Sequence, residues 1–164
     1  MLDFLKWIEN TGFSTWVRES PSPFAFPTVL LLHTIGMGLC VGINAGFDLR
    51  ILGFAPGIRL GPMQRFLPVF WLGFIVNAIT GTILVMQDAS SKLRNPDFYV
   101  KMVFIALALT TLRLLQKRVF ADPGLDKKPF SSHQKMLAVL SLFFWIGAIT
   151  AGRLLAYVGM PGLG

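Results

Sequence analysis

Four long apolar runs divide the chain, and each is long enough to cross a membrane as a helix. They cover about residues 27–47, 66–86, 98–115 and 136–158. A helix needs roughly 20 mainly apolar residues to cross about 30 Å of hydrocarbon. Stretches rich in Gly, Pro and Asp separate the runs. We therefore predict an all-α integral membrane four-helix bundle that takes up residues 1–164 as a single transmembrane domain.

The segment of about residues 2–19 has a different pattern, because it is too short and too polar to span. Its apolar residues recur at helical spacing with charged residues among them, and it includes Trp7 and Trp16. This pattern is typical of an amphipathic helix that lies in the plane of the membrane interface. We predict one interfacial helix, or two short ones, with the two tryptophans as anchors.

Local signals mark where the first and last spans begin. Pro27 suits the first turn of a helix, where its missing N–H group costs nothing. Ser131 is followed three residues later by Gln134, which fits a capping box at the start of the last span.

The apolar composition of the chain changes how its net positive charge is interpreted. The chain is 54% hydrophobic and 14% charged, which is too apolar for a soluble domain of this size. The net charge of +7 would suggest nucleic acid in a soluble protein. Here the Lys and Arg residues lie mainly between the apolar runs, so we expect contact with the lipid bilayer and no nucleic acid partner. A single cysteine, Cys40, rules out an intrachain disulfide.

The distribution of basic residues predicts the orientation. Nine of the 15 Lys and Arg residues flank or lie within the loops of about residues 48–65 and 116–135. Basic loops tend to stay in the cytoplasm. We therefore expect both termini outside and these two loops in the cytoplasm.

His33 is the sharpest candidate for a functional group. It lies six residues into the first span, about 9 Å deep at 1.5 Å per residue. Arg153 should lie at a similar depth on the last span, so we expect both to project into the outer third of the bundle. A histidine there can bind haem iron, relay a proton or form a hydrogen bond. Arg153 could pair with a haem propionate, or simply extend to the interface. Met86 is a candidate sixth ligand.

Small and polar residues predict contacts between helices. Gly38, Gly42 and Gly46 recur every four residues on the first span, and such ladders let helix backbones approach closely. The ladder fits packing within the chain, with homodimerisation as the alternative. A second face, on the second span, predicts an interhelical hydrogen bond and close packing; its residues are Gly73, Asn77, Thr80 and Gly81.

Polar residues recur along one face of the first span, from His33 through Asn44 to Asp48 at its C-terminal end. A carboxylate is unfavourable at a helix C-terminus, so we expect a cationic partner from Arg50, Arg113 or Lys117. The alternative is that Asp48 forms a solvated ion pair in the loop, which would contribute little to stability.

Three motifs together resemble an uncharacterised family of four-span bacterial inner-membrane proteins. They are Leu32-His33-Thr34-Ile35-Gly36 through Gly42 to Asp48-Leu49-Arg50-Ile51-Leu52-Gly53, then Asn95-Pro96 with Lys101, and finally Ala151-Gly152-Arg153-Leu154-Leu155-Ala156-Tyr157. The resemblance implies a multi-pass protein of the bacterial inner membrane. More distantly, the start of the first span is similar to four-helix haem-binding and copper-resistance membrane domains. The other histidine, His133, should lie near the opposite surface, so the two cannot ligate one haem.

Three functions remain open from the sequence. The protein could hold a b-type haem through His33 and pass electrons to a partner or quinone. It could instead be a cofactor-free accessory subunit, contacting other membrane subunits or a second copy. A small transporter is the third possibility. No phosphate loop, nucleophile elbow or zinc-protease motif is present, so we expect no independent catalytic activity.

Overall fold

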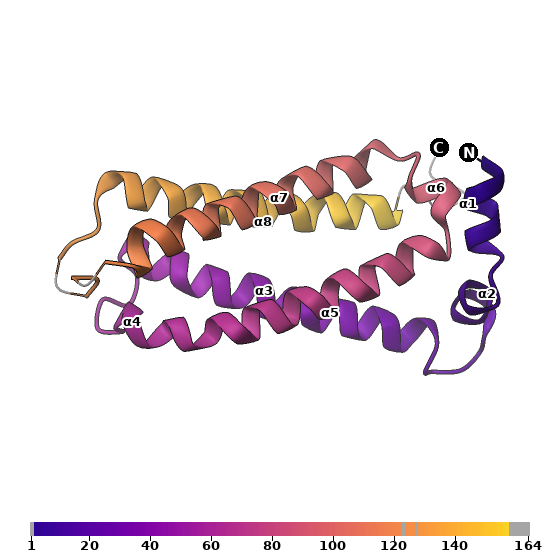
Figure 1. The fold of residues 1–164 in the computed structure, drawn as a ribbon, viewed down its shortest axis with the longest axis horizontal. Coiled ribbons are helices and arrows are strands. Elements are labelled where there is room, and N and C mark those ends of the chain that lie inside the picture. The colour runs from indigo at the N-terminus through magenta and orange to yellow at the C-terminus, as the bar shows by residue number, and fades with distance from the viewer. Residues whose placement is uncertain (1, 123, 127, 158–164) are drawn as a thin grey trace.

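Four helical segments are long enough to span a membrane. They run antiparallel to their neighbours in the chain along a common axis (Figure 1). The computed structural model describes residues 2–122, 124–126 and 128–157, and all of its regular elements are helices. In chain order the helices are α1 (Leu2–Glu9), α2 (Gly12–Glu19), α3 (Phe26–Leu52), α4 (Leu60–Met63), a 3-10 turn (Gln64–Phe66), α5 (Leu67–Met86), α6 (Ala89–Lys92), α7 (Pro96–Leu115), a π-helical segment (Gln116–Phe120) and α8 (Ser132–Tyr157).

The exposed surface of the long helices is apolar, as expected for a protein that crosses a bilayer. The segments of spanning length and hydropathy are Phe26–Leu52, Leu60–Met86, Pro96–Phe120 and Ser132–Leu155. Only 17–33% of the residues in their most apolar windows are buried inside the protein. Exposing the remaining apolar surface to water would be unfavourable, whereas contact with lipid hydrocarbon is not. The chain is therefore a multi-pass membrane protein built as a four-helix bundle.

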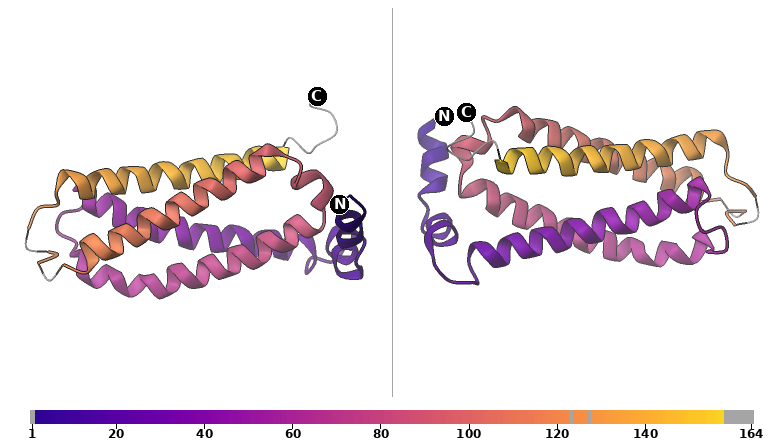
Figure 2. Two further views of the ribbon diagram at one scale, coloured as in Figure 1. Left: turned by 45° about the horizontal axis from the view of Figure 1, so that its top comes forward. Right: turned by 180° about the vertical axis from the view of Figure 1, so that it is seen from behind.

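The N-terminal segment forms two short helices rather than one. Thr11 separates them, and its hydroxyl accepts a hydrogen bond from the N–H of Ser14 at the start of α2. Figure 2 shows that α1 and α2 lie across one end of the long helices, the end at which α8 also finishes. Trp7 and Trp16 are 65% and 45% exposed there. Their position agrees with interfacial anchoring.

Two boundaries test the sequence signals directly. The capping box of α8 is confirmed, because Gln134 accepts from the N–H of Ser131 at 2.8 Å while its own N–H donates to the Ser131 hydroxyl at 3.3 Å. The first span is longer than predicted and continues to Leu52, with Gly53 in a left-handed conformation (φ 105°). The extra turn is stabilised because Ile51 is fully buried against neighbouring helices.

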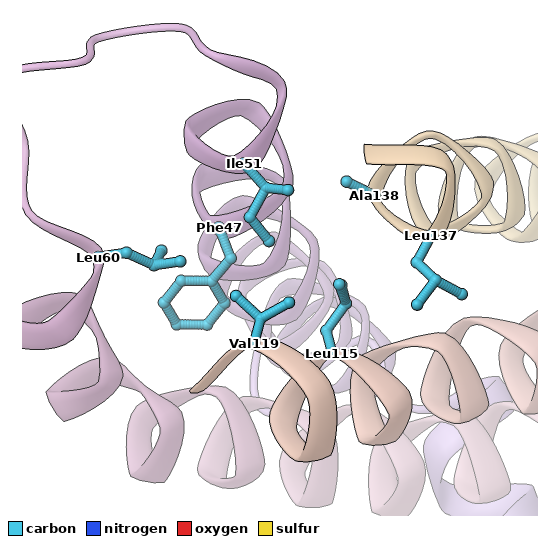
Figure 3. Close-up of a cluster of buried hydrophobic side chains, with 7 residues drawn as sticks. All are labelled: Phe47, Ile51, Leu60, Leu115, Val119, Leu137 and Ala138. Atoms are coloured by element: carbon cyan, nitrogen blue, oxygen red, sulfur yellow. The ribbon is translucent and has the colours of Figure 1, made fainter. Parts of the chain in front are cut away.

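The helices pack as two pairs. α3 packs mainly against α5, α7 packs mainly against α8, and contact between α3 and α8 joins the pairs. At the end that carries the loop of residues 53–59, which we call the sealed end, apolar side chains fill the space between helices (Figure 3). This core contains Phe47, Ile51, Leu60, Leu115, Val119, Leu137 and Ala138. The end that carries α1 and α2 is called the open end below.

Candidate functional site

The site begins where α3 and α5 cross with their backbones in contact. A Cβ atom on Gly36 would lie 2.7 Å from the carbonyl oxygen of Gly73 and 2.9 Å from the backbone nitrogen of Asn77. Real Cβ atoms do not come this close, so only glycine fits. This crossing fixes the depth and rotation of the first two spans relative to one another.

His33 lies one turn before that crossing and is held by a reciprocal pair of hydrogen bonds. Asn77 donates from its side-chain Nδ2 to the backbone carbonyl of His33 at 2.7 Å. In return, His33 Nδ1 lies 3.1 Å from the backbone carbonyl of Asn77 and 3.1 Å from the hydroxyl of Thr80. A carbonyl only accepts, so the hydrogen of a neutral imidazole must be on Nδ1. The Nε2 lone pair is then free, since the described residues give it no hydrogen-bond partner.

A cavity of about 890 Å³ opens beside His33 at the open end of the bundle. Its walls come from α3, α5, α7 and α8, with α2 and α6 at its rim. Most of the wall is apolar. Three cationic side chains also line it, from Arg18, Lys92 and Lys101, against one acidic side chain, Asp88. The combination of apolar walls and excess positive charge fits an amphiphilic anion.

Lys101 occupies the place that the sequence assigned to Arg153. A Cβ on Gly152 would lie 3.4 Å from both Cε and Nζ of Lys101, so the lysine side chain crosses the face of α8 where that helix has no side chain. Arg153 is exposed and does not line the cavity. The prediction that it faces the bundle is wrong, because successive helical residues are rotated by about 100° and Gly152 already points inward.

The predicted roles of Met86 and His133 have different outcomes. Met86 is half-buried but does not line the cavity, so the structure gives no support for it as a ligand beside His33. Met102 on α7 is a methionine that does line it. His133 lies at the sealed end, where its Nε2 is 3.1 Å from Arg118. The two histidines are therefore at opposite ends, as predicted.

The glycine ladder of the first span does not pack within the chain. A Cβ on Gly38 or Gly42 would meet nothing within 4 Å, and on Gly46 it would meet only the methyl group of Met63 at 3.6 Å. The intramolecular interpretation is thus wrong at Gly38 and Gly42, which lie on an outer face of α3. Close packing instead uses Gly36, which was not among the predicted packing residues.

The second polar face behaves as the sequence predicts. Gly73 faces the Cβ of Leu39 and the carbonyl of Gly36, and Asn77 forms the expected interhelical hydrogen bond. A Cβ on Gly81 would lie 3.1 Å from Cε1 of His33. A signal for Gly36 was present in the sequence: it lies three residues after His33, just as Gly73 lies four before Asn77. In a helix both spacings place the glycine on the face of the polar residue.

The rim of the cavity is tied to the interfacial helices by polar contacts. Glu9 accepts from the N–H and the hydroxyl of Ser90, at 2.5 and 2.6 Å, and Arg18 donates to the carbonyl of Gln87 at 3.1 Å. Burial raises the pKa of Glu9, but the two Ser90 hydrogen bonds and nearby Arg18 outweigh it, and the pKa is lowered overall. These contacts hold α1 and α2 against residues 87–90 at the rim of the cavity.

Two rim charges are partly desolvated. Burial lowers the pKa of Lys92, an effect that the negative charge of Asp88 partly offsets. Burial also raises the pKa of Asp88. Both shifts mean that the charged forms are less stable here than in water. An anion bound in the cavity would favour the charged form of Lys92.

A separate polar cluster is buried between α3 and α8. Asn44 donates from Nδ2 to Oδ2 of Asp48 at 2.6 Å and to the hydroxyl of Ser141 at 2.7 Å. The expected cationic partner of Asp48 is absent among the described residues: Arg50 bonds the carbonyl of Ile58, and Arg113 stacks on Trp71. That prediction is wrong, because Asp48 turns inward to the α8 interface and not outward to the basic loops.

Comparisons of the chain with known protein families, with curated proteins and with solved structures found no match. Function must therefore follow from the chemistry of the cavity.

Proposed function

We propose that the cavity binds a b-type haem through His33, and that the protein is a small membrane electron-transfer protein. The observation that carries this proposal is the state of the imidazole. A histidine that ligates a metal usually donates its other ring N–H to a carbonyl or carboxylate, which fixes the tautomer and the ring orientation. His33 meets this requirement through the carbonyl of Asn77, and its Nε2 has no protein partner in the described chain.

The charges of the cavity support a ligand with two acidic groups. Haem is a flat apolar ring with two propionates at one edge, and Lys92, Lys101 and Arg18 are the cations that line the cavity. Hydrogen bonds from cations to carboxylates are about twice as strong as neutral ones. Lys101 thus takes the role that the sequence suggested for Arg153. The remaining walls, including Phe74, Ala78 and Ile105, would contact the ring.

In a haem-bound protein, His33 would hold the iron through Nε2, and Met102, which lines the same cavity, would be the candidate second ligand. A bound haem would supply one-electron transfer, to a partner protein or a quinone. The chain itself would hold the ring, keep Nε2 available and balance the propionate charge. We place the protein in the bacterial inner membrane, with both termini and the cavity on the outer side, in line with the basic residues of the opposite loops.

The test is the absorption spectrum of the full chain purified after expression with haem precursor, or after addition of haemin. We expect a Soret band at about one haem per chain. His33→Ala should abolish it, whereas the matched variant His133→Ala should keep it. Lys101→Met should retain haem but change its reduction potential, because a positive charge near the propionates is lost. A protein that gains no Soret band from haemin would refute the proposal.

A second function is favoured by the open glycine face of α3. Gly38 and Gly42 lie on a surface where a second membrane helix could approach the backbone closely. This supports an accessory subunit or a homo-oligomer, with or without a cofactor. The mass of the protein in mild detergent tests it: we expect a species larger than the 18.2 kDa chain, which Gly42→Leu converts to monomer. A monomeric wild-type protein that stays unpartnered in native membranes would exclude it.

A further inference from the structure

The polar cluster between α3 and α8 contains a buried carboxylate without a counter-charge. Asn44, Asp48 and Ser141 are each 0% exposed. Both hydrogens of the Asn44 amide are used, one on Asp48 and one on Ser141. Two oxygens remain buried with no hydrogen-bond partner, Oδ1 of Asn44 and Oδ1 of Asp48. The unpartnered atoms of the cluster are therefore acceptors.

This arrangement is costly unless something positive joins it. A buried polar atom without a partner costs free energy, and an unpaired buried charge costs much more, above all within a membrane. Within the described residues, Lys, Arg and His nitrogens form ion pairs within 4.0 Å only with Glu19 and Asp126, not with Asp48. A positive charge from outside the described side chains, either a cation or a proton, would remove this cost.

We propose that Asn44, Asp48 and Ser141 form a binding site for a sodium ion. The oxygens available are one carboxylate, one amide carbonyl and one hydroxyl, which are ligands that hard cations prefer. The site carries a single negative charge, so a monovalent cation neutralises it and a divalent one leaves a buried positive charge. Asn44 Nδ2 lies 2.6 Å from Oδ2 of Asp48 and 2.7 Å from the hydroxyl of Ser141, so the three side chains are adjacent. All three are fully buried, and the limited space favours a small ion over a large one. The site is independent of the cavity around His33.

The test uses thermal unfolding of the purified full chain in detergent, in sodium, potassium or choline chloride at equal ionic strength. A ligand that binds only the folded state stabilises it by RT ln(1 + [L]/Kd), so Tm rises with the logarithm of the ligand concentration once this exceeds Kd. We expect Na⁺, but not K⁺, to raise Tm by roughly 5 °C at a hundredfold excess over its Kd. Binding of radiolabelled Na⁺ should saturate at about one ion per chain.

Variants separate this site from general salt effects. Asp48→Asn should abolish both the Na⁺-dependent shift and the radiolabel binding, whereas Asp97→Asn, the same change on α7, should leave both intact. Ser141→Ala keeps the charge but removes one oxygen from the site. It should therefore raise the Na⁺ concentration needed for a given rise in Tm by about tenfold. It also serves as the test if Asp48→Asn does not fold.

Three outcomes would overturn the sodium site. The first is a Tm that is equal in sodium and choline. The second is an Na⁺ response that survives Asp48→Asn. The third is a stability that depends on pH through Asp48 but not on Na⁺, which would mean that a proton neutralises the carboxylate. None of these outcomes bears on haem binding at His33.

Discussion

The sealed end and the open end of the bundle are made from the same long helices, yet they use the space between those helices differently. At the sealed end, apolar side chains from α3, α4, α7 and α8 fill it (Figure 3). At the open end the same spans surround a cavity of about 890 Å³ that is lined by three cations. Large apolar side chains are exposed at both ends, for example Leu31 and Leu154 at the open end and Leu49 and Val139 at the sealed end, so lipid exposure does not explain the difference.

The difference comes from which residues point inward. Bulky apolar residues such as Phe47 and Ile51 do so at the sealed end, whereas small residues and long cations, including Gly81, Gly152 and Lys101, do so at the open end. Small residues leave room that the flexible cations only partly occupy. We infer that the sealed end provides most of the stability and that the open end gives up packing in order to bind a ligand.

The largest effect should come from a cavity cut into the sealed end. Phe47 is buried and packs edge-on against Phe120, with ring centroids 5.2 Å apart. Phe47→Ala should destabilise the protein by about 3 kcal/mol, the lower end of the range for buried Phe, because lipid gives no hydrophobic drive between helices. Phe98→Ala at the cavity should cost less than half as much. Unfolding in mixed detergent would measure both, and equal losses would contradict the proposed division of roles.

A smaller effect is expected at the α3–α5 crossing that links the two ends. Gly36→Ala places a methyl group 2.7 Å from a backbone oxygen and should cost about 2 kcal/mol through overpacking. Gly42→Ala, on the same helix, meets no atom within 4 Å in the chain and should change the stability of the monomer little. Tm in detergent compares the two. If Gly42→Ala were the more damaging, the glycine ladder and not this crossing would hold the fold.

Asp126, in a loop at the sealed end, should contribute about 1 kcal/mol to the stability of the folded protein. Its carboxylate accepts from the N–H groups of Leu60 and Gly61, at 2.7 and 2.9 Å, and so caps α4. Asp126→Ala should lower stability by about 1 kcal/mol, which is typical of a lost cap. Asp122→Ala, in the same loop, serves as the control. Faster hydrogen exchange at residues 60–63 in Asp126→Ala alone would localise the effect, and unchanged exchange there would contradict it.

The smallest effect should come from Glu9, which helps to dock α1 at the open end. This contribution should depend on pH. Because the pKa of Glu9 is lowered in the folded protein, its contribution is present above pH 4.5 and is lost as the pH falls through the lowered value. Trp7 fluorescence should report undocking in acid, with all other tryptophans replaced by phenylalanine. Glu9→Gln should undock α1 at neutral pH and remove the transition, and Asp3→Asn should not. Docking that persists in Glu9→Gln would show that apolar contacts suffice.

Much of the architecture could be predicted because it depends on local patterns. Length and hydropathy define the spans, and Ser131 with Gln134 marks a helix start through contacts three residues apart. The site was predicted only in part. His33 and Asn77 were found because polar residues are rare in spans, but Arg153 was chosen over Lys101 and Gly42 over Gly36, since a helix that is apolar all round does not reveal which face turns inward.

The sequence by itself determined that this protein has four spans, an interfacial N-terminal segment and a histidine near one membrane surface. Each of these follows from composition and periodicity within a single segment. Only the tertiary structure decided which cations share a cavity with His33, that Asp48 is buried against Ser141 with no counter-charge, and that one end is sealed while the other is open. These features depend on the rotation of each helix about its axis, which is set by packing contacts between residues far apart in the chain, such as Gly36 and Gly73.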